Sequence, residues 1–328
     1  MKSHSQTQEL KSQLLDAKNI AVFGHRNVDG DALWSCLALG TVLENLGKKV
    51  SYYTTETPSS SFDFLEWTKK FKTNFDYHPH YDLLIFLDTA DPTQLLREIW
   101  EWHEEYFAKM NTVVIDHHYT NTKYAKFNIV DDTASSACEL LAELLYECDP
   151  EWIDDQVATY LFLWLSTDTG HFIYEQDSSR TFTIAAYLMD QWAAKKDIIS
   201  KLYRSASMKS IKFLGKLSER ITKKENVIYS YYRHSELAEY GIDKEKADSI
   251  LGILTRIDHD GVFALVKIHD HESPPFLKAS LRSKSWINVA EVAARFGGWG
   301  HKAAAGLKTE IGENWEKELE RFVGELNT

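Results

Sequence analysis

The sequence is poor in cysteine, has no long hydrophobic run and carries no excess of basic residues. Its three cysteines, Cys36, Cys138 and Cys148, have neither metal-type nor disulfide-type spacing, which predicts a reducing, cytoplasmic setting. The longest strongly apolar run, residues 157–165, is too short to cross a bilayer. The first residues also lack the apolar segment of a signal peptide. We therefore expect a cytoplasmic protein with no membrane partner.

Acidic residues outnumber basic ones, 49 against 37, and the formal net charge is -12. This balance argues against a long nucleic acid as a stable partner, because such binding depends on a basic surface. A small anionic substrate remains compatible with it, because bound cations and a few arginines can reverse the sign of the charge locally. The 328 residues, of which 44% are hydrophobic, suffice for two domains that each have their own core.

Short apolar runs alternate with helical patterns in the first half of the chain, which predicts an α/β domain with a parallel sheet. The expected strands are 20–23, 49–54, 82–87, 112–115 and 127–130. The expected helices are 6–18, 32–47, 93–109, 135–147, 154–165 and 178–192. We expect this domain to span 1–194 and to be joined by a basic helical linker, 195–225, to a smaller α+β domain, 226–328. In that second domain the expected strands are 227–233, 262–268 and 276–282, and the expected helices are 244–257, 289–296 and one from residue 314.

Acidic and histidine residues follow several of these apolar elements at the point where each ends. They are His25, Asp29, Asp31, Asp88, Asp116, His117, His118 and Asp168. Ligands of open parallel sheets bind at the carboxyl ends of the strands, and clustered carboxylates and imidazoles suit a divalent cation. The alternative is that Asp31 caps the helix that follows it and that the others are ordinary polar residues of turns.

A second group of residues lies in the second half of the chain. Arg282 offers a bidentate fork to a phosphate, and Gly297, Gly298 and Gly300 could present backbone N–H groups to an anion. The alternative for the glycines is a tight turn after a helix, with Gly297 at its C-terminal end.

These motifs together resemble the DHH phosphoesterase superfamily, named after the triad seen here as Asp116-His117-His118. The segments 280–283 and 296–306 resemble its DHHA1 accessory domain. That domain is found in the subfamily of nanoRNases, phosphoadenosine-phosphate phosphatases and cyclic-dinucleotide phosphodiesterases. The resemblance implies hydrolysis of short oligoribonucleotides or phosphoadenosine phosphate through a water activated by two divalent cations, Mn²⁺ or alternatively Mg²⁺. It also implies a homodimer.

The resemblance further implies a role for each matching residue. The metal ligands would be His25, Asp29, Asp31, Asp88, His117 and Asp168, with Asp88 bridging both cations. The catalytic residues would be Asp88, Asp116 and His118. The substrate-binding residues would be Arg282, Ser283, Gly298, Trp299, Gly300 and His301.

The sequence departs from the family pattern at Val28, Trp34 and Trp299, which bear on specificity more than on hydrolysis. His171 has no role that the resemblance supplies. Alternative functions are hydrolysis of cyclic dinucleotides or their linear products, hydrolysis of pyrophosphate or polyphosphate, and nucleotide sensing without turnover.

Overall fold

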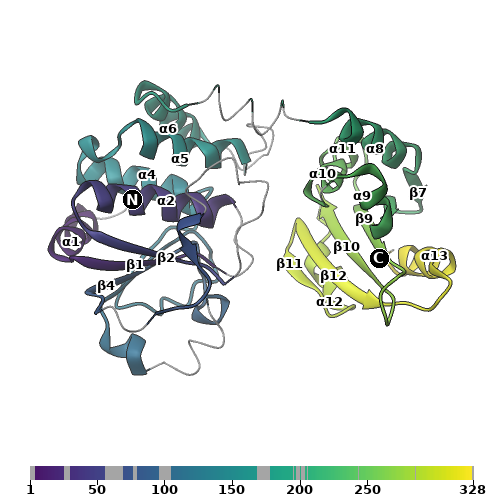
Figure 1. Ribbon diagram of the computed structural model, residues 1–328, viewed down its shortest axis with the longest axis horizontal. Coiled ribbons are helices and arrows are strands. Elements are labelled where there is room, and N and C mark those ends of the chain that lie inside the picture. Colours follow the sequence, from purple (N-terminus) through teal and green to yellow (C-terminus); the bar gives the residue numbers. More distant parts are fainter. Residues whose placement is uncertain are drawn as a thin grey trace. The chain divides into compact units, whose positions relative to one another are not determined.

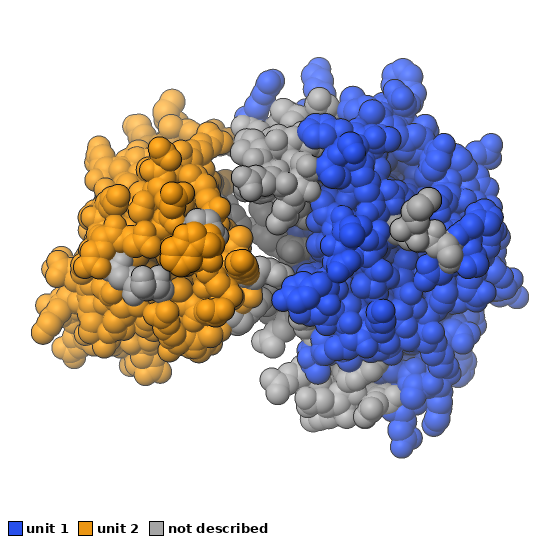
Figure 2. Space-filling model, turned by 180° about the vertical axis from the view of Figure 1, so that it is seen from behind, with its two compact units in different colours: residues 1–204 blue, residues 205–328 orange. Residues whose placement is uncertain are grey.

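The computed structural model describes residues 4–25, 30–55, 69–76, 80–95, 105–167, 178–194, 196, 200, 204, 206–242, 244–284 and 286–326. Contacts divide the chain into two compact units, residues 1–204 and 205–328, which Figure 2 colours separately. No helix within the described ranges combines the length and the apolar character needed to cross a membrane.

The first unit is built on a six-stranded parallel sheet. Its strands are β1 (Asn19–Phe23), β2 (Lys49–Tyr53), β3 (Phe71–Lys72), β4 (Leu83–Leu87), β5 (Thr112–Asp116) and β6 (Phe127–Val130). The strand order is β3-β2-β1-β4-β5-β6. The central strands are continuous apolar runs because both faces of the sheet are covered.

Helices form the layer on one face of this sheet (Figure 1). They are α1 (His4–Asp16), α2 (Gly30–Asn45), α4 (Ala137–Cys148), α5 (Asp155–Thr167) and α6 (Ser179–Asp190). Helix α2 is buried on nearly all sides because it contacts β1, β2 and β4 as well as α4 and α5. An aromatic cluster that includes Phe23, Phe75 and Phe86 packs on the opposite face.

The second unit has a mixed six-stranded sheet in the order β11-β12-β10-β9-β8-β7. Its strands are β7 (Thr222–Lys224), β8 (Val227–Arg233), β9 (Val262–His269), β10 (Phe276–Ser283), β11 (Trp299–His301) and β12 (Ala304–Glu310). Helices α12 (Val289–Ala294) and α13 (Trp315–Glu325) pack on one face. Over β8 and β9, the other face is covered by α8 (Met208–Glu219), α9 (His234–Tyr240), α10 (Lys244–Asp248) and α11 (Ile250–Leu254).

The two sheets confirm the predicted α/β fold with a second, smaller domain. The boundary between the two units falls within the segment expected to be a linker, 195–225, because residues from 205 onward belong to the second unit. The reason is that Phe213 and Leu217 of α8 are fully buried against β8 and β9. The helix expected over 244–257 is split at Ser249 into α10 and α11. Of the helix expected over 93–109, residues 96–104 lie outside the described part.

Four elements of the second unit and one short strand were not predicted. They are α9, β7, β11, β12 and β3. Two single-turn 3₁₀ helices, Pro92–Gln94 and Pro150–Trp152, also lie in the described part of the first unit.

Candidate metal and catalytic centre

The candidate site lies where three neighbouring strands of the first sheet end. His25 follows β1, Asp88 follows β4, and His117 and His118 follow β5. From β1 the chain adds β2 and β3 on one side of the sheet, and from β4 it adds β5 and β6 on the other side. The direction in which strands are added therefore reverses between β1 and β4. This reversal is the topological switch point of an open parallel sheet, where ligands bind beyond the carboxyl ends of the strands.

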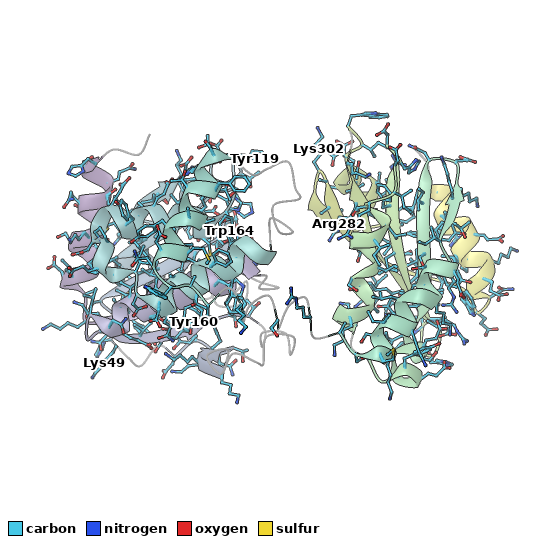
Figure 3. The ribbon with its side chains drawn as sticks, turned by 90° about the horizontal axis from the view of Figure 1, so that it is seen from above. Lys49, Tyr119, Tyr160, Trp164, Arg282 and Lys302 are labelled. Carbon is cyan, nitrogen blue, oxygen red and sulfur yellow. The ribbon has the colours of Figure 1, made fainter. Side chains whose placement is uncertain are left out.

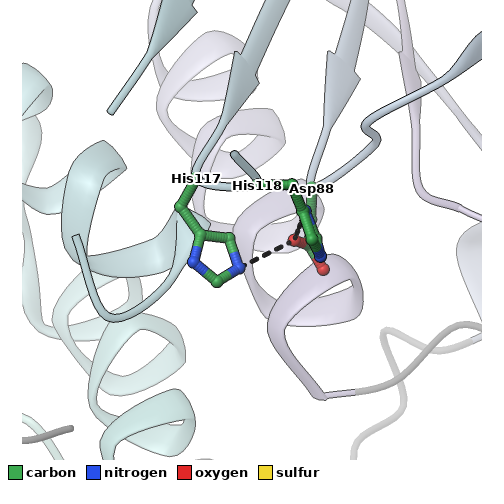
Figure 4. Close-up of side chains that lie close together, drawn as sticks. All are labelled: Asp88, His117 and His118. Atoms are coloured by element: carbon green, nitrogen blue, oxygen red, sulfur yellow. Dashed lines mark ion pairs between the residues drawn. The ribbon is translucent and has the colours of Figure 1, made fainter. Parts of the chain in front are cut away.

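Asp88 is the centre of this group (Figure 4). Its side chain is 3% exposed, and its Oδ2 lies 3.4 Å from His25 Nε2. The other oxygen, Oδ1, lies 3.4 Å from His117 Nε2 and 3.6 Å from His118 Nδ1. Oδ1 is buried, and among the described residues no donor meets it with hydrogen-bond geometry. Ligand atoms of Asp88, His117 and His118 all lie within 4.8 Å of one another, which is close enough to hold a metal ion.

The electrostatics of Asp88 and His117 are those of opposite charges packed together. Burial alone would raise the pKa of Asp88, but His117 and His25 outweigh it and hold that pKa below its ordinary value. Burial would likewise lower the pKa of His117, yet the carboxylates of Asp88, Asp31 and Asp116 raise it to about 10. These carboxylates therefore favour positive charge at His117, and a bound cation would supply such charge in its place.

A backbone carbonyl fixes the orientation of the His117 ring. Its Nδ1 lies 3.3 Å from the carbonyl oxygen of Ala134, to which it donates, and its Nε2 therefore faces the carboxylates. Nε2 lies 3.9 Å from Asp31 Oδ2 as well as near Asp88. A backbone carbonyl behind the ring is the usual partner of a metal-ligating histidine.

His118 is held differently, by a buried carboxylate. Its Nδ1 donates to Asp116 Oδ1 at 2.8 Å, and Asp116 is fully buried. The other Asp116 oxygen accepts from Asn121 Nδ2 at 2.6 Å, and the same amide donates to the carbonyl of Thr89 at 3.1 Å. Burial opposes a charge on His118, but Asp116 and Asp88 raise its pKa. Asn121 was not predicted as a site residue, although its place three residues after His118 is the signal that could have indicated it.

Asp31 connects the helix in which it lies to a second helix. It is in the first turn of α2, but its two carboxylate oxygens accept from the backbone N–H groups of Ala137 and Cys138, at 2.7 and 2.9 Å. These are the first N–H groups of α4, whose partial positive charge favours an anion. Asp31 thus ties α2 to α4 and lies beside His117 at the same time.

The structure therefore brings together His25, Asp31, Asp88, Asp116, His117 and His118. Val28, Asp29, Asp168 and His171 lie outside the described residues. Trp34 is fully buried on α2 and stacks in parallel on Tyr160 of α5, with ring centroids 6.5 Å apart. Tyr160 and Trp164, both on α5, are labelled in Figure 3.

In the second unit, Arg282 and Ser283 lie on opposite faces of β10. Alternation along the strand places Arg282, labelled in Figure 3, on the less buried face, where its Nη1 donates to the carbonyl of Leu281 at 2.9 Å. The same alternation leaves Ser283 buried. Arg282 pairs with Ala304 of β12, which pairs in turn with His301 of β11. The side chains of Trp299 and His301 are outside the described part of the structure.

The glycines correct one expectation. The N–H groups of Gly297 and Gly298 donate to the carbonyls of Ala294 and Ala293, so they close the end of α12 and do not form an anion cradle. Gly297 has a φ of +71°, as expected for the turn after a helix. A Cβ on Gly298 would lie 2.4 Å from the carbonyl oxygen of Gly306, and one on Gly300 would lie 2.4 Å from Ala305 Cα. These two glycines allow β11 to approach β12.

Comparison with known proteins agrees with this architecture. Residues 19–163 match the DHH family, N-terminal domain, and residues 224–328 match the DHHA1 domain. Over 94% of its length the chain is 23% identical to the bifunctional oligoribonuclease and PAP phosphatase NrnA of Thermus thermophilus, covering 90% of that protein. It is 24% identical to the NrnA protein of Bacillus subtilis, over 93% of both chains. It is also 24% identical to the cyclic-di-AMP phosphodiesterase PdeA of Listeria monocytogenes, covering 48% of that protein.

Among solved structures, an exopolyphosphatase-related protein from Bacteroides fragilis has the same fold, with a TM-score of 0.86 at 20% identity. The match covers 99% of this chain and 96% of that one. The two family models occur in the order that the motifs predict, and each falls on one of the two sheets. The chain belongs to the DHH phosphoesterase superfamily, with an N-terminal DHH domain followed by a DHHA1 domain.

Proposed function

We propose that this chain hydrolyses phosphate esters of short oligoribonucleotides, of phosphoadenosine phosphate, or of both. The observation that supports it most is the convergence of His25 and His117 on the buried carboxylate of Asp88 in a DHH domain. The DHHA1 domain and the names of the NrnA relatives support the substrate class.

The residues present fit divalent cations. Asp88 Oδ1 is a buried anionic oxygen to which no residue of the described ranges donates a hydrogen bond, and its neighbours offer imidazole nitrogen and carboxylate oxygen. Such a donor set suits Mn²⁺, our proposed metal, or Mg²⁺, and not a thiolate-bound metal. We propose as ligands His25, Asp29, Asp31, Asp88, His117 and Asp168. When bound, two such cations supply Lewis-acid activation of a water and neutralise charge on the phosphoryl oxygens.

His118 is our candidate for the proton donor to the leaving oxygen. Its Nδ1–H is committed to Asp116, so the ring presents Nε2 for proton transfer. Asp116 fixes the tautomer and favours the protonated ring, which a general acid requires. Asp88 would be shared between the two cations.

Arg282 is our candidate for binding a second phosphate of the substrate, with Trp299, Gly300 and His301 completing the proposed binding set. Ser283 is left out because it is buried on the opposite face of β10, and Gly298 because its N–H donates to the carbonyl of Ala293. Cyclic dinucleotides are a second candidate substrate, favoured by the relative PdeA, of which this chain spans about half the length. We further infer a cytoplasmic location from three cysteines that are free and buried, and a homodimer as the assembly.

The test compares purified protein, stripped of metal and reloaded with Mn²⁺, on five substrates. They are a diribonucleotide, a long single strand, a cyclic dinucleotide, phosphoadenosine phosphate and pyrophosphate. We expect turnover of the diribonucleotide or of phosphoadenosine phosphate, and its loss in Asp88→Asn. Arg282→Ala should raise KM for substrates with a terminal phosphate, while Lys317→Ala, a charge change on α13, should not. Turnover of pyrophosphate alone would contradict the proposal.

A further inference from the structure

The sheet of the second unit has a face that its helices cover only in part. Helices α8 to α11 form a core with β8 and β9, and no side chain of β10 or β12 belongs to that core. Along β10 the side chains alternate, so that Leu277, Ala279 and Leu281 enter the core on the opposite face. Phe276, Lys278, Ser280 and Arg282 therefore line the first face.

Two lysines lie directly opposite each other on this face. Lys278 of β10 pairs in register with Lys308 of β12, and both side chains are exposed. Like charges in directly opposite positions destabilise a sheet. In the part of the chain that the structure describes, neither lysine has a carboxylate within ion-pair distance. Glu310, opposite Phe276 on the same face, pairs with neither of them.

One aromatic ring keeps the two ammonium groups together. Lys308 Nζ lies 3.9 Å from the centroid of the Phe276 ring, and Lys278 Nζ lies 5.8 Å from it. The Phe276 ring stacks on His269, with centroids 4.3 Å apart. Burial, with the charges of His234 and Lys278, lowers the pKa of His269 to about 4. His269 is therefore uncharged at neutral pH, and the positive charge beside the Phe276 ring comes from Lys278 and Lys308.

The lysine pair is continuous with Arg282. The two positions on β10 are four residues apart, which is about 13 Å along a strand. Between them the surface is made by Ser280 and, opposite it, Gly306, both small residues. A phosphate adjacent to one bound at Arg282 would fall short of the lysines, because adjacent phosphates of an extended strand are closer together than this.

We propose that Lys278 and Lys308 form an anion subsite for a backbone phosphate of an oligonucleotide whose end is held at Arg282. The subsite is reached only by strands longer than a dinucleotide. It rests on the proposed function and deepens it, because it makes affinity depend on the length of the strand.

The test measures binding of fluorescein-labelled, hydrolysis-resistant phosphorothioate oligoribonucleotides to the Mn²⁺-loaded protein by fluorescence anisotropy, over a range of salt concentrations. The tested variant carries both Lys278→Gln and Lys308→Gln. The matched control is Lys223→Gln with Lys317→Gln, which changes the net charge equally at exposed lysines on β7 and α13. The ligands are a dinucleotide, a pentanucleotide and inorganic tripolyphosphate.

For the pentanucleotide, we expect the variant to lose about 2- to 30-fold in affinity, the range for two exposed ion pairs. The slope of log K against log salt should become shallower by up to about 1.4, because each single-strand phosphate contact contributes about 0.7. Dinucleotide binding and the control variant should be unchanged. A variant that behaves like the control, or that loses dinucleotide or tripolyphosphate binding equally, would overturn the subsite. If the unaltered protein binds and cleaves no oligonucleotide, the oligoribonucleotide part of the proposed function fails and the subsite fails with it.

Discussion

Replacing Asp116 by asparagine tests whether a buried charge controls the proposed proton donor. The two Asp116 oxygens accept from His118 Nδ1 at 2.8 Å and from Asn121 Nδ2 at 2.6 Å. An asparagine has one acceptor oxygen and one donor NH₂, so in either orientation one partner faces a donor. A hydrogen bond to a charged group contributes about 1.5–3 kcal/mol, which corresponds to a loss of about 10- to 150-fold in kcat.

The direction of the pH effect follows from the same geometry. Asp116 raises the pKa of His118, so its neutralisation should lower that pKa. A general acid with a lower pKa loses its proton at lower pH, and the alkaline limb of kcat should shift toward acid. The assay is kcat against pH on a dinucleotide at saturating Mn²⁺, with thermal unfolding as a check of folding. Asn121→Ala is the control, because it removes one of the two hydrogen bonds that Asp116 accepts and keeps the charge of Asp116. If kcat falls in Asp116→Asn while the alkaline limb stays in place, the charge has no role in proton donation.

Three further changes test other parts of the structure. Asp88→Asn should weaken Mn²⁺ binding, measured by calorimetry, by at least about 100-fold, and unchanged affinity would reject Asp88 as a shared ligand. Asp31→Asn should lower the free energy of unfolding of the metal-free first unit by about 1–2 kcal/mol in urea, because the N-terminus of α4 loses the carboxylate that accepts its N–H groups. An unchanged free energy of unfolding would show that this contact contributes nothing. The pKa of Glu236 is lowered to about 2, since ion pairs with Arg220 and Lys216 outweigh its burial. Its contribution, about 3 kcal/mol, should be present above pH 4.5 and lost toward pH 2, so Glu236→Gln should destabilise the protein at pH 7 and much less at pH 3.

The strand ends of the first unit could be predicted because the signal is local. An apolar run that stops at an acidic residue, as before Asp88, indicates a buried strand and its end together. Parallel strands place those ends on one edge, so His25, Asp88 and His117 could be expected to meet without knowledge of the distances. The left-handed backbone of Asp88 could not be predicted, because many residues can follow a strand without adopting it.

The role of Asp31 could not be found in the same way. Its partners are backbone N–H groups 106 and 107 positions further along the chain, and such groups carry no side-chain signature. The glycines of the second unit show a related limit. The same residues fit an anion cradle or a helix end, and only the φ of Gly297 and the acceptors of its neighbours decide between them.

Asp88 combines a backbone requirement with a chemical one, and the two can be separated. Its φ of +55° lies in the left-handed region, which aspartate and asparagine adopt more readily than other non-glycine residues. Asp88→Asn therefore changes the charge with little change in backbone preference, whereas Asp88→Ala changes both. If the backbone conformation matters, metal-free Asp88→Ala should be less stable than Asp88→Asn by about 1 kcal/mol. Equal stabilities would mean that the left-handed backbone at residue 88 costs alanine nothing, and the backbone requirement at this position would be rejected.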